Sequence, residues 1–229
     1  MVTEFVGTNK LGDTIGLVIA NIDSQLKEKM NIGTRYNSIG IVGARTGAGP
    51  HIFAADEAVK STNSEILSIE LPRDTKGGGG HGSLIIFGAD DVSDVRKAVE
   101  ICLADLERTF GDVYGNDAGH LEFQYSARAS QALAKGLGAE KGKAFGITVA
   151  SPAAIGVILA DTAVKAAAVE VRAYSSPGHG TSYSNEVILG ISGDSGAVKQ
   201  AIISAREVGI ELLAAMGDRP ESTTKPYIL

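Results

Sequence analysis

The segment LADTAVKAAAVEV, residues 159–171, decides how this chain is interpreted, because a related segment, AADEAVKSTNSEI, residues 54–66, precedes it. Both segments contain the pattern A-D-x-A-V-K, which aligns Lys60 with Lys165 at an offset of 105 positions (165 minus 60). Similarity at a fixed long period is the mark of a duplicated structural unit. We therefore interpret the chain as two copies of one domain.

The segments around this pattern repeat as well. SIGIVGA (38–44) resembles AFGITVA (144–150), and SLIIFGADDVSDVRKA (83–98) resembles EVILGISGDSGAVKQA (186–201). Further upstream, GLVIAN resembles HLEFQY, and each is expected to form a strand that a short helix follows. The predicted domains comprise residues 1–110 and 111–229.

Each copy is predicted to interleave strands with helices. Gly49-Pro50 and Ser151-Pro152 follow apolar strands and are expected to begin alanine-rich helices, with proline at the first helical position. Small alanine side chains let a helix lie close to a sheet. The pattern predicts an α+β fold in which a small sheet is covered by helices.

The last helix of each copy is expected to begin at an acidic cap. The candidates are Asp90 or Asp91 in the first copy and Asp194 in the second, because aspartate accepts a hydrogen bond from a free amide of the first turn. Residues 107–117 (ERTFGDVYGND) are the expected connector between the two copies.

Composition excludes several classes of protein. The 229 residues carry a net charge of −6 without a basic run, which argues against a nucleic-acid partner. A single cysteine, Cys102, excludes an intramolecular disulfide and fits a reducing cytoplasm. No stretch has the length and apolarity of a signal core or a membrane span, so no membrane partner is expected.

The segment RDTKGGGGHGSLIIF, residues 73–87, formally contains G-x-G-x-x-G at Gly77, Gly79 and Gly82. A dinucleotide fingerprint needs a helix after the glycines, whereas an apolar strand, LIIFG, follows here. We therefore do not expect a nucleotide site.

The second copy has a matching loop at 175–186, and both loops contain the tripeptide Gly-His-Gly. His81 and His179 are either solvated loop residues or residues that line an opening made by oligomerisation, and the sequence leaves both interpretations open. The other two histidines, His51 and His120, do not show ligand spacing, so no metal site is predicted.

Catalysis is not expected. Cys102 lies on the apolar stripe of a predicted helix, which favours a buried thiol, and the G-x-S-x-G pattern of a nucleophile elbow is absent. Glu70, Arg73, Asp74 and Lys76 form a mixed-charge stretch, for which a salt-bridged strand end or a pore rim is the commoner explanation. The sequence predicts a protein that is not an enzyme and needs no cofactor.

The series A-D-x-A-V-K, apolar strand, glycine-rich loop, strand and G-D-x-G-A-V resembles the shell domain of bacterial microcompartments. Two such domains in one chain, each preceded by a strand–helix pair, resemble the circularly permuted tandem shell proteins of propanediol- and ethanol-utilisation compartments. Long segments carry the resemblance, among them IGIVGARTGAGPHI, SIELPRDTKGGGGHGSL and AYSSPGHGTSYSNE. It implies two tandem ferredoxin-like domains, related by internal duplication and circularly permuted.

The resemblance also implies a structural function. Proteins of this class form homotrimers that mimic hexamers, and the trimers tile with other shell proteins into facets around encapsulated enzymes in the bacterial cytoplasm. Small polar metabolites such as diols or alcohols pass through pores and bind there weakly. An alternative that shares the sheet–helix pattern is a trimeric ligand-binding regulatory protein of ferredoxin-like domains.

Carried over by position, the resemblance implies three groups of site residues. A channel through each subunit would be lined by Arg45, Thr46, Gly47, Ala48, Gly49, Ser83, Ser182, Ser184 and Asn185. Glycine suits a narrow opening because it has no Cβ and tolerates positive φ. The glycine-rich pore-region loops would contribute Lys76, Gly79, Gly80, His81, Gly82, Ser176, Gly178, His179 and Gly180. Lys60 and Lys165 would lie at the tile edge, although a lysine at a helix C-terminus is also an ordinary solvated cation.

Overall fold

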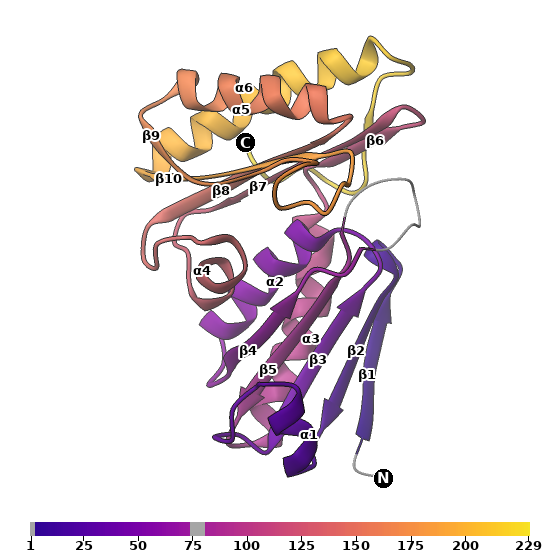
Figure 1. The fold of residues 1–229 in the computed structure, drawn as a ribbon, viewed down its shortest axis with the longest axis vertical. Coiled ribbons are helices and arrows are strands. Elements are labelled where there is room, and N and C mark those ends of the chain that lie inside the picture. Colours follow the sequence, from indigo (N-terminus) through magenta and orange to yellow (C-terminus); the bar gives the residue numbers. More distant parts are fainter. Residues whose placement is uncertain (1–2, 74–80) are drawn as a thin grey trace. The chain divides into compact units, whose positions relative to one another are not determined.

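The computed structural model describes residues 3–73 and 81–229 (Figure 1). The chain divides into two compact units, the first ending at Leu106 and the second beginning at Glu107. The domain boundary expected after residue 110 stays a prediction.

The first unit contains one antiparallel sheet with the strand order β1-β2-β3-β5-β4. Helix α3 packs on this sheet, because Val95 and Val99 lie directly over Gly40 of the central strand. The elements of this part of the chain are β1 (Thr3–Asn9), the 3₁₀ turn η1 (Leu11–Asp13), β2 (Thr14–Ile19), α1 (Ser24–Lys29), β3 (Ser38–Ala44), α2 (Ala48–Lys60), β4 (Glu65–Glu70), β5 (Ser83–Ala89) and α3 (Val92–Thr109).

The second unit repeats this architecture, and its sheet has the order β11-β6-β7-β8-β10-β9. Helices α5 and α6 lie side by side and cover one face of the sheet (Figure 1). The elements are β6 (Val113–Asn116), β7 (Gly119–Ser126), α4 (Gln131–Leu137), β8 (Ala144–Ser151), α5 (Ala153–Ala166), β9 (Val169–Ser175), β10 (Val187–Gly193), α6 (Ser195–Ala214) and β11 (Glu221–Ser222).

The two sheets also share an irregularity. In the β4–β5 pair the register shifts between Ile66 and Ser68, so the ladder skips Leu67. In the β9–β10 pair the register shifts so that Arg172 is skipped. Leu67 and Arg172 are separated by 105 positions (172 minus 67), the same offset as the A-D-x-A-V-K repeats. A bulge at the same place confirms that the two units are copies of one design.

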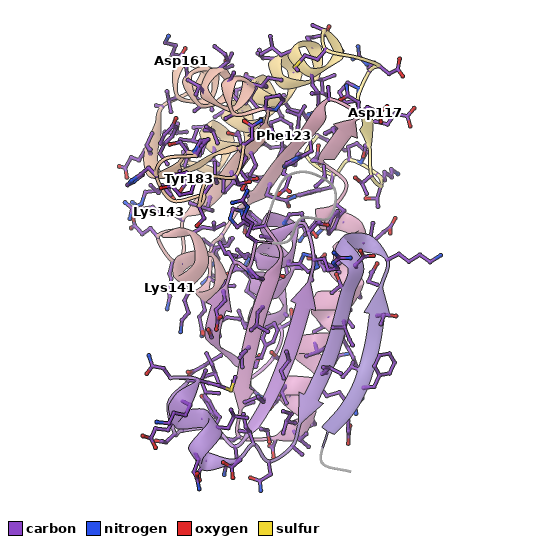
Figure 2. The ribbon with its side chains drawn as sticks, turned by 45° about the vertical axis from the view of Figure 1, so that its right-hand side comes forward. Asp117, Phe123, Lys141, Lys143, Asp161 and Tyr183 are labelled. Carbon is purple, nitrogen blue, oxygen red and sulfur yellow. The ribbon has the colours of Figure 1, made fainter. Side chains whose placement is uncertain are left out.

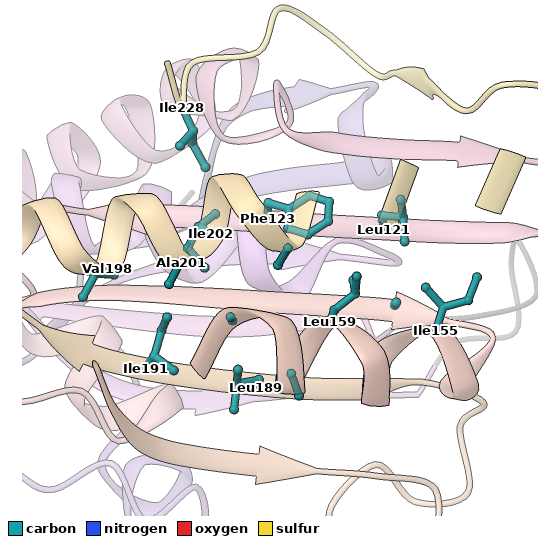
Figure 3. Close-up of a cluster of buried hydrophobic side chains, with 14 of the residues drawn as sticks. Leu121, Phe123, Ile155, Leu159, Leu189, Ile191, Val198, Ala201, Ile202 and Ile228 are labelled. Atoms are coloured by element: carbon teal, nitrogen blue, oxygen red, sulfur yellow. The ribbon is translucent and has the colours of Figure 1, made fainter. Parts of the chain in front are cut away.

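The core of the second unit lies between its sheet and helices α5 and α6 (Figure 3). Leu121 and Phe123 alternate along β7 with polar residues and point toward the helices, as the two-residue period of a strand requires. Leu159 of α5 and Ile202 of α6 contribute from the helices. This burial of apolar side chains is the main stabilising contribution to the unit.

The structure confirms the α+β class and the tandem repeat, and it corrects several details. The expected connector 107–117 is wrong, because α3 continues to Thr109 and residues 113–116 form strand β6, which pairs with β7. Strands β1 and β6 were not foreseen in either copy. Asp194 is confirmed as the N-cap of α6, since its carboxylate accepts a hydrogen bond from the Gly196 amide at 3.0 Å.

Neither proline occupies the first helical position. Pro50 is the third residue of α2, and Pro152 is the N-cap residue that precedes α5. The N-cap and the first three positions of a helix all tolerate proline, because their amides have no carbonyl partner within the helix and the missing N–H costs nothing there. The composition of the segment therefore could not fix the exact helix start.

Candidate functional site

The predicted channel loop of the first unit, residues 45–49, is held by backbone hydrogen bonds. The amides of Arg45 and Thr46 donate to the Gly12 carbonyl at 2.8 and 3.2 Å. Gly47 adopts the left-handed conformation, with φ 79° and ψ 45°, which allows the chain to turn sharply into α2. The loop therefore presents its backbone in a fixed conformation at the start of the helix.

The buried side chain of His51 connects this loop to strand β2. Its Nδ1 lies 2.6 Å from the Gly47 carbonyl oxygen and its Nε2 lies 2.7 Å from Thr14 Oγ1. A carbonyl oxygen only accepts, so Nδ1 carries the proton and donates it. Complete burial lowers the pKa of His51 to about 4, so the ring is neutral at physiological pH. His51 is a structural residue of the loop, in keeping with its lack of ligand spacing.

The end of the glycine-rich loop, residues 81–83, lies against residues 44–48. The Ala48 amide donates to the His81 carbonyl at 3.0 Å, and Ala44 pairs with Ser83 across the β3–β5 ladder. A Cβ on Gly82 would lie 2.3 Å from the Ala44 carbonyl oxygen, so only glycine fits there. The structure thus brings the predicted residues 45–49 together with 81–83.

Ser83 shows an unusual feature of this cluster. The residue is almost fully buried, and its hydroxyl has no hydrogen-bond partner among the residues that the structure describes. A buried hydroxyl without a partner carries a desolvation cost, which makes it a candidate contact for a polar molecule. Lys76, Gly79 and Gly80, which the sequence placed in the same pore region, lie outside the described residues.

The matching loop of the second unit, residues 176–186, folds into a compact turn. Ser176 and His179 exchange backbone hydrogen bonds at 2.7 and 2.8 Å, and the Ser184 amide donates to the Thr181 carbonyl at 2.9 Å. Ser182 and Tyr183 both have positive φ, and Tyr183 points into solvent (Figure 2). The exposed residues of this turn are Gly178, His179, Gly180, Ser182 and Asn185, whereas Ser184 is buried.

Asn185 connects this turn to the next helix. Its Oδ1 accepts a hydrogen bond from the Ala153 amide, the first residue of α5, at 3.1 Å. Both units therefore place the β4–β5 or β9–β10 loop beside the start of the α2 or α5 helix. The two histidines are also comparable, since His81 forms an isolated bridge with Arg73 and His179 forms one with Ser176.

A buried polar cluster in the second unit was missed by the sequence interpretation. His120 and Glu122 lie on the face of β7 opposite the helices, because Leu121 and Phe123 occupy the helix side. His120 opposes Ser151 across the β7–β8 ladder, and its Nε2 lies 3.8 Å from Oε2 of the buried Glu186. Polar residues at every second position of HLEFQYS were the signal that could have revealed this face.

Burial controls the ionisation of this cluster. Burial, together with the neighbouring Glu186 carboxylate, raises the pKa of Glu122 to about 8. Burial also lowers the pKa of His120, against the opposing effect of Glu186. Glu122 is consequently held as a neutral acid at pH 7, able to donate one hydrogen bond as well as accept.

The two predicted edge lysines have different surroundings. Lys60 is three-quarters buried and pairs with the buried Asp56 at 2.9 Å and with Glu57 at 2.7 Å. Lys165 pairs with Asp161 at 2.7 Å, and both of these side chains are exposed. The repeat thus preserves the ion pair but not its environment.

Other chemistry has little support in the structure. Burial raises the pKa of the Cys102 thiol far above its usual range, which removes its nucleophilic form. Among residues 3–73 and 81–229, no three His, Cys, Asp or Glu side chains are grouped so that they could hold a metal ion. In the same part of the chain, no helix has the length and apolarity needed to cross a bilayer.

One antiparallel α+β unit occurs twice, with five strands in the same order, the same bulge and a glycine-containing loop beside the same helix start. This repetition defines a tandem-duplicated α+β protein. The family model described as the BMC domain matches this chain twice, at residues 38–116 and 144–217. The chain therefore belongs to the BMC-domain family of bacterial microcompartment shell proteins.

Individual relatives agree with this assignment. The bacterial microcompartment shell protein PduB of Salmonella typhimurium is 66% identical over 226 residues, which cover 99% of this chain and 83% of that protein. The crystal structure of a trimeric shell protein PduB superposes with a TM-score of 0.95 at 53% identity, covering 98% of this chain and 99% of that one. EtuB from Clostridium kluyveri gives a TM-score of 0.94 at 54% identity, with 98% of both chains covered.

Proposed function

We propose that this chain is a tile of a bacterial microcompartment shell. Three copies associate into a homotrimer, in which six similar domains form a pseudohexameric plate. The plates join edge to edge, with one another and with other shell proteins, into facets around encapsulated enzymes. The role is structural rather than catalytic, and small polar metabolites cross the facet through pores.

The observation that carries this proposal is the identity of the two units. Five strands follow the same order in both sheets, with β11 added at one edge of the second, and the bulge recurs after 105 positions. Similar domains can occupy similar positions around a closed ring, and cyclic closure is the usual route by which a soluble chain forms an oligomer of fixed size. The trimeric state of the PduB relative of known structure supports the same arrangement.

We further propose that the loop clusters contact polar metabolites in transit. They offer backbone amides, the Ser182 hydroxyl and the Asn185 side chain, which exchange hydrogen bonds with a diol or alcohol at little net cost. Such a contact favours passage over tight binding. A millimolar dissociation constant, which corresponds to about 4 kcal/mol, is the expected strength.

Electron microscopy of the purified protein tests the main proposal. Flat sheets or angular arrays of plates about one trimer across are expected. Discrete trimers that never associate laterally and that bind a small effector tightly would instead identify a regulatory protein of ferredoxin-like domains. Protein that stays monomeric and forms no plates would refute the shell function.

A crystal soaked in glycerol tests the pore assignment. Glycerol is expected against residues 45–49 or 182–185, with partial occupancy. Ser182→Ala and Asn185→Ala variants should show lower glycerol occupancy without unfolding, since both residues are exposed. Glycerol absent from both loops at molar concentration would remove these residues from the pore.

A further inference from the structure

Strand β7 is longer than its neighbour β6 in the sheet of the second unit. Strand β6 pairs with the first four residues of β7, whereas β7 continues to Ser126. The chain before β6 cannot extend this pairing far, because it is still in helix α3 at Thr109. The backbone groups of Phe123 and Tyr125 on the β6 side therefore need other partners. A strand edge with free N–H and C=O groups is a template for pairing with another chain.

Two groups from other parts of the unit occupy this half of the β7 edge. The Phe123 amide donates a hydrogen bond to the Asp112 carbonyl at 2.9 Å. Two residues further along, the Tyr125 amide donates to the Tyr227 hydroxyl at 3.0 Å. The hydrogen of that hydroxyl faces the Tyr125 carbonyl oxygen at 3.2 Å and Gln124 Oε1 at 3.1 Å. The hydroxyl of Tyr227 thus takes the place of a neighbouring strand at Tyr125.

Tyr227 belongs to residues 223–229, which we call the C-terminal clasp. The clasp follows β11, which pairs with β6, and then reaches the β7 edge. The Asp112 carboxylate accepts hydrogen bonds from the amides of Tyr227 and Ile228 at 2.8 and 3.0 Å. The Arg206 guanidinium donates to the Ile228 carbonyl at 2.7 Å. Charged side chains therefore fix the backbone of the clasp, and such hydrogen bonds are stronger than those between neutral groups.

Side chains of the clasp add packing to these hydrogen bonds. Ile228 is 1% accessible and points into the core between the sheet and helices α5 and α6 (Figure 3). The Arg108 guanidinium lies 4.8 Å from the centre of the Tyr227 ring, a cation–π contact. The clasp is consequently a fixed part of the second unit that lies along the free half of the β7 edge.

The first unit covers the same edge with a strand. Tyr125 opposes Gly146, and Val18 opposes Gly40, the residue that aligns with Gly146 in the repeat, so Val18 takes the place of Tyr125 by strand register. On its other side Val18 pairs with Glu4 of β1. The clasp thus supplies in the second unit the cover that β1 supplies in the first.

We propose that the C-terminal clasp guards the free half of the β7 edge, and so keeps this sheet from pairing with an extended segment of another chain. A free edge accepts an added strand through main-chain hydrogen bonds, and proteins commonly prevent this by covering the edge. The segment that fits the edge is the clasp itself, with its tyrosine hydroxyl at Tyr125 and its isoleucine in the core. The proposal goes beyond the shell function and does not depend on it.

A Tyr227→Phe variant tests the contact at the edge, because it removes the hydroxyl and keeps the ring. Exchange of the Tyr125 amide hydrogen, followed by NMR, should become about tenfold faster than in the parent chain, since that amide loses its acceptor. Tyr36→Phe is the matched control, because Tyr36 is a buried tyrosine of the first unit. It should leave the exchange at Tyr125 unchanged. Equal exchange at Tyr125 in Tyr227→Phe and in the parent chain would overturn the proposal.

Removal of residues 223–229 tests the guard. The truncated chain is expected to keep its secondary structure by circular dichroism and to form thioflavin-binding aggregates about tenfold faster than the parent chain. The parent chain under the same conditions accounts for any assembly into plates. Added peptide TTKPYIL, the sequence of the clasp, should suppress the aggregation, whereas the same peptide with Tyr227→Ala should not. A folded truncated chain that aggregates no faster than the parent would overturn the proposal, and so would equal suppression by the two peptides.

The point variants keep the test decisive if the truncated chain does not fold. Tyr227→Phe retains the whole clasp and loosens it at the edge alone, so it should aggregate faster than Tyr36→Phe at the same protein concentration. Equal aggregation rates of these two variants would overturn the proposal and leave the shell function standing.

Discussion

The two units are built alike but expose different parts of the same helix. Around α2, the apolar stripe Ile52, Phe53 and Val59 is buried in the single chain, whereas around α5 the aligned side chains are half exposed. The ion pairs follow the same rule, since Asp56 is buried and Asp161 is not. Duplication preserved the strand order, the bulge and the loops, and the surroundings of each copy then set the burial of each side chain.

The difference teaches that equal positions in a duplicated fold need not have equal energetics. For example, the charged Arg45 aligns with the neutral Ser151, and the apolar Leu103 aligns with the charged Arg206. Four comparisons by substitution examine such contrasts, beginning with the largest expected change in stability. Unfolding should be compared at a fixed protein concentration, because the stability of an oligomer depends on it.

The buried carboxylate of Asp112 pairs with Arg206, whose aligned position in the first unit holds Leu103, a side chain that cannot form an ion pair. Its oxygens accept hydrogen bonds from the backbone amides of Tyr227 and Ile228 at 2.8 and 3.0 Å and from the Arg206 guanidinium at 2.5 Å. Asp112→Ala leaves a largely buried guanidinium unpaired and should lower the free energy of unfolding by about 3–5 kcal/mol. Urea denaturation measures the change.

A control for this substitution is available in the same unit. Glu211→Ala breaks the exposed Arg219–Glu211 pair and should cost no more than about 1 kcal/mol. Equal losses of unfolding free energy in the two variants would mean that the hydrogen bonds of Asp112 do not stabilise the C-terminal segment.

A second contrast lies in the core. Phe123 opposes Thr148 across β7 and β8, and Gly16 opposes Val42 across β2 and β3. Thr148 and Val42 align in the repeat, so by strand register a phenylalanine in one sheet takes the place of a glycine in the other. Phe123→Ala should cost about 3–5 kcal/mol through the cavity it creates. Gly16→Ala should cost about 1–3 kcal/mol by overpacking, since its Cβ would lie 2.6 Å from a methyl group of Val99. Thermal melting ranks the two.

Gly115→Ala is the control for the glycine effect. A Cβ at Gly115 would meet its nearest neighbour at 3.6 Å, an ordinary contact. This variant should melt close to the parent chain. If Gly16→Ala melts with it, helix α3 does not close directly over the glycines of the first sheet.

These cores also explain what the sequence could predict of the fold. The repeat, the apolar strands and the Asp194 cap are local patterns, and they were sufficient for the α+β class and for most elements. Strands β1 and β6 could not be found in the same way, because VYGN carries too few apolar residues to signal a strand and is stabilised by its pairing with β7. Helix α3 extends beyond its expected end to Thr109, a polar residue that is fully buried, and nothing in the segment ERT signals that burial.

The candidate site likewise contains contacts that local sequence patterns predicted and contacts that they did not. Residues 45–49 and 81–83 come together as predicted, since both flank paired strands β3 and β5 and the register brings their ends to one edge. Their contact with a metabolite stays a prediction. Glu186 was not foreseen, because its burial next to His120 depends on three strands, β7, β8 and β10, that are distant in sequence.

The buried acid Glu122 gives a third contrast. It opposes Val149, and Ile15 opposes Gly43, the residue that aligns with Val149, so by strand register Ile15 takes the place of Glu122 in the first sheet. Its pKa is raised to about 8 in the folded chain, so folding favours the neutral form. The stabilisation is therefore complete below the unfolded pKa near 4.5 and is lost as the pH rises through 8. Relative to Glu122→Gln, the parent chain should lose on the order of 2–4 kcal/mol between pH 5 and 9.

Urea denaturation at several pH values measures that difference, and Glu140→Gln serves as the control at an exposed carboxylate. The control should follow the parent chain at every pH. Parallel curves for the parent and Glu122→Gln would mean that the Glu122 carboxyl ionises in the folded chain as it does in water.

The smallest expected change separates folding from assembly at the two edge lysines. Lys60→Ala removes a partner of the buried Asp56 and should cost about 1–2 kcal/mol, whereas Lys165→Ala breaks an exposed pair and should cost less than about 0.5 kcal/mol. Lys60→Arg, which keeps the charge, should restore most of the loss. Since Lys165→Ala leaves the fold intact, a loss of sheets in this variant under the electron microscope would report directly on contacts between tiles. Unchanged sheets in both alanine variants would remove the edge assignment, and equal destabilisation would show that the two copies of the pair are energetically alike.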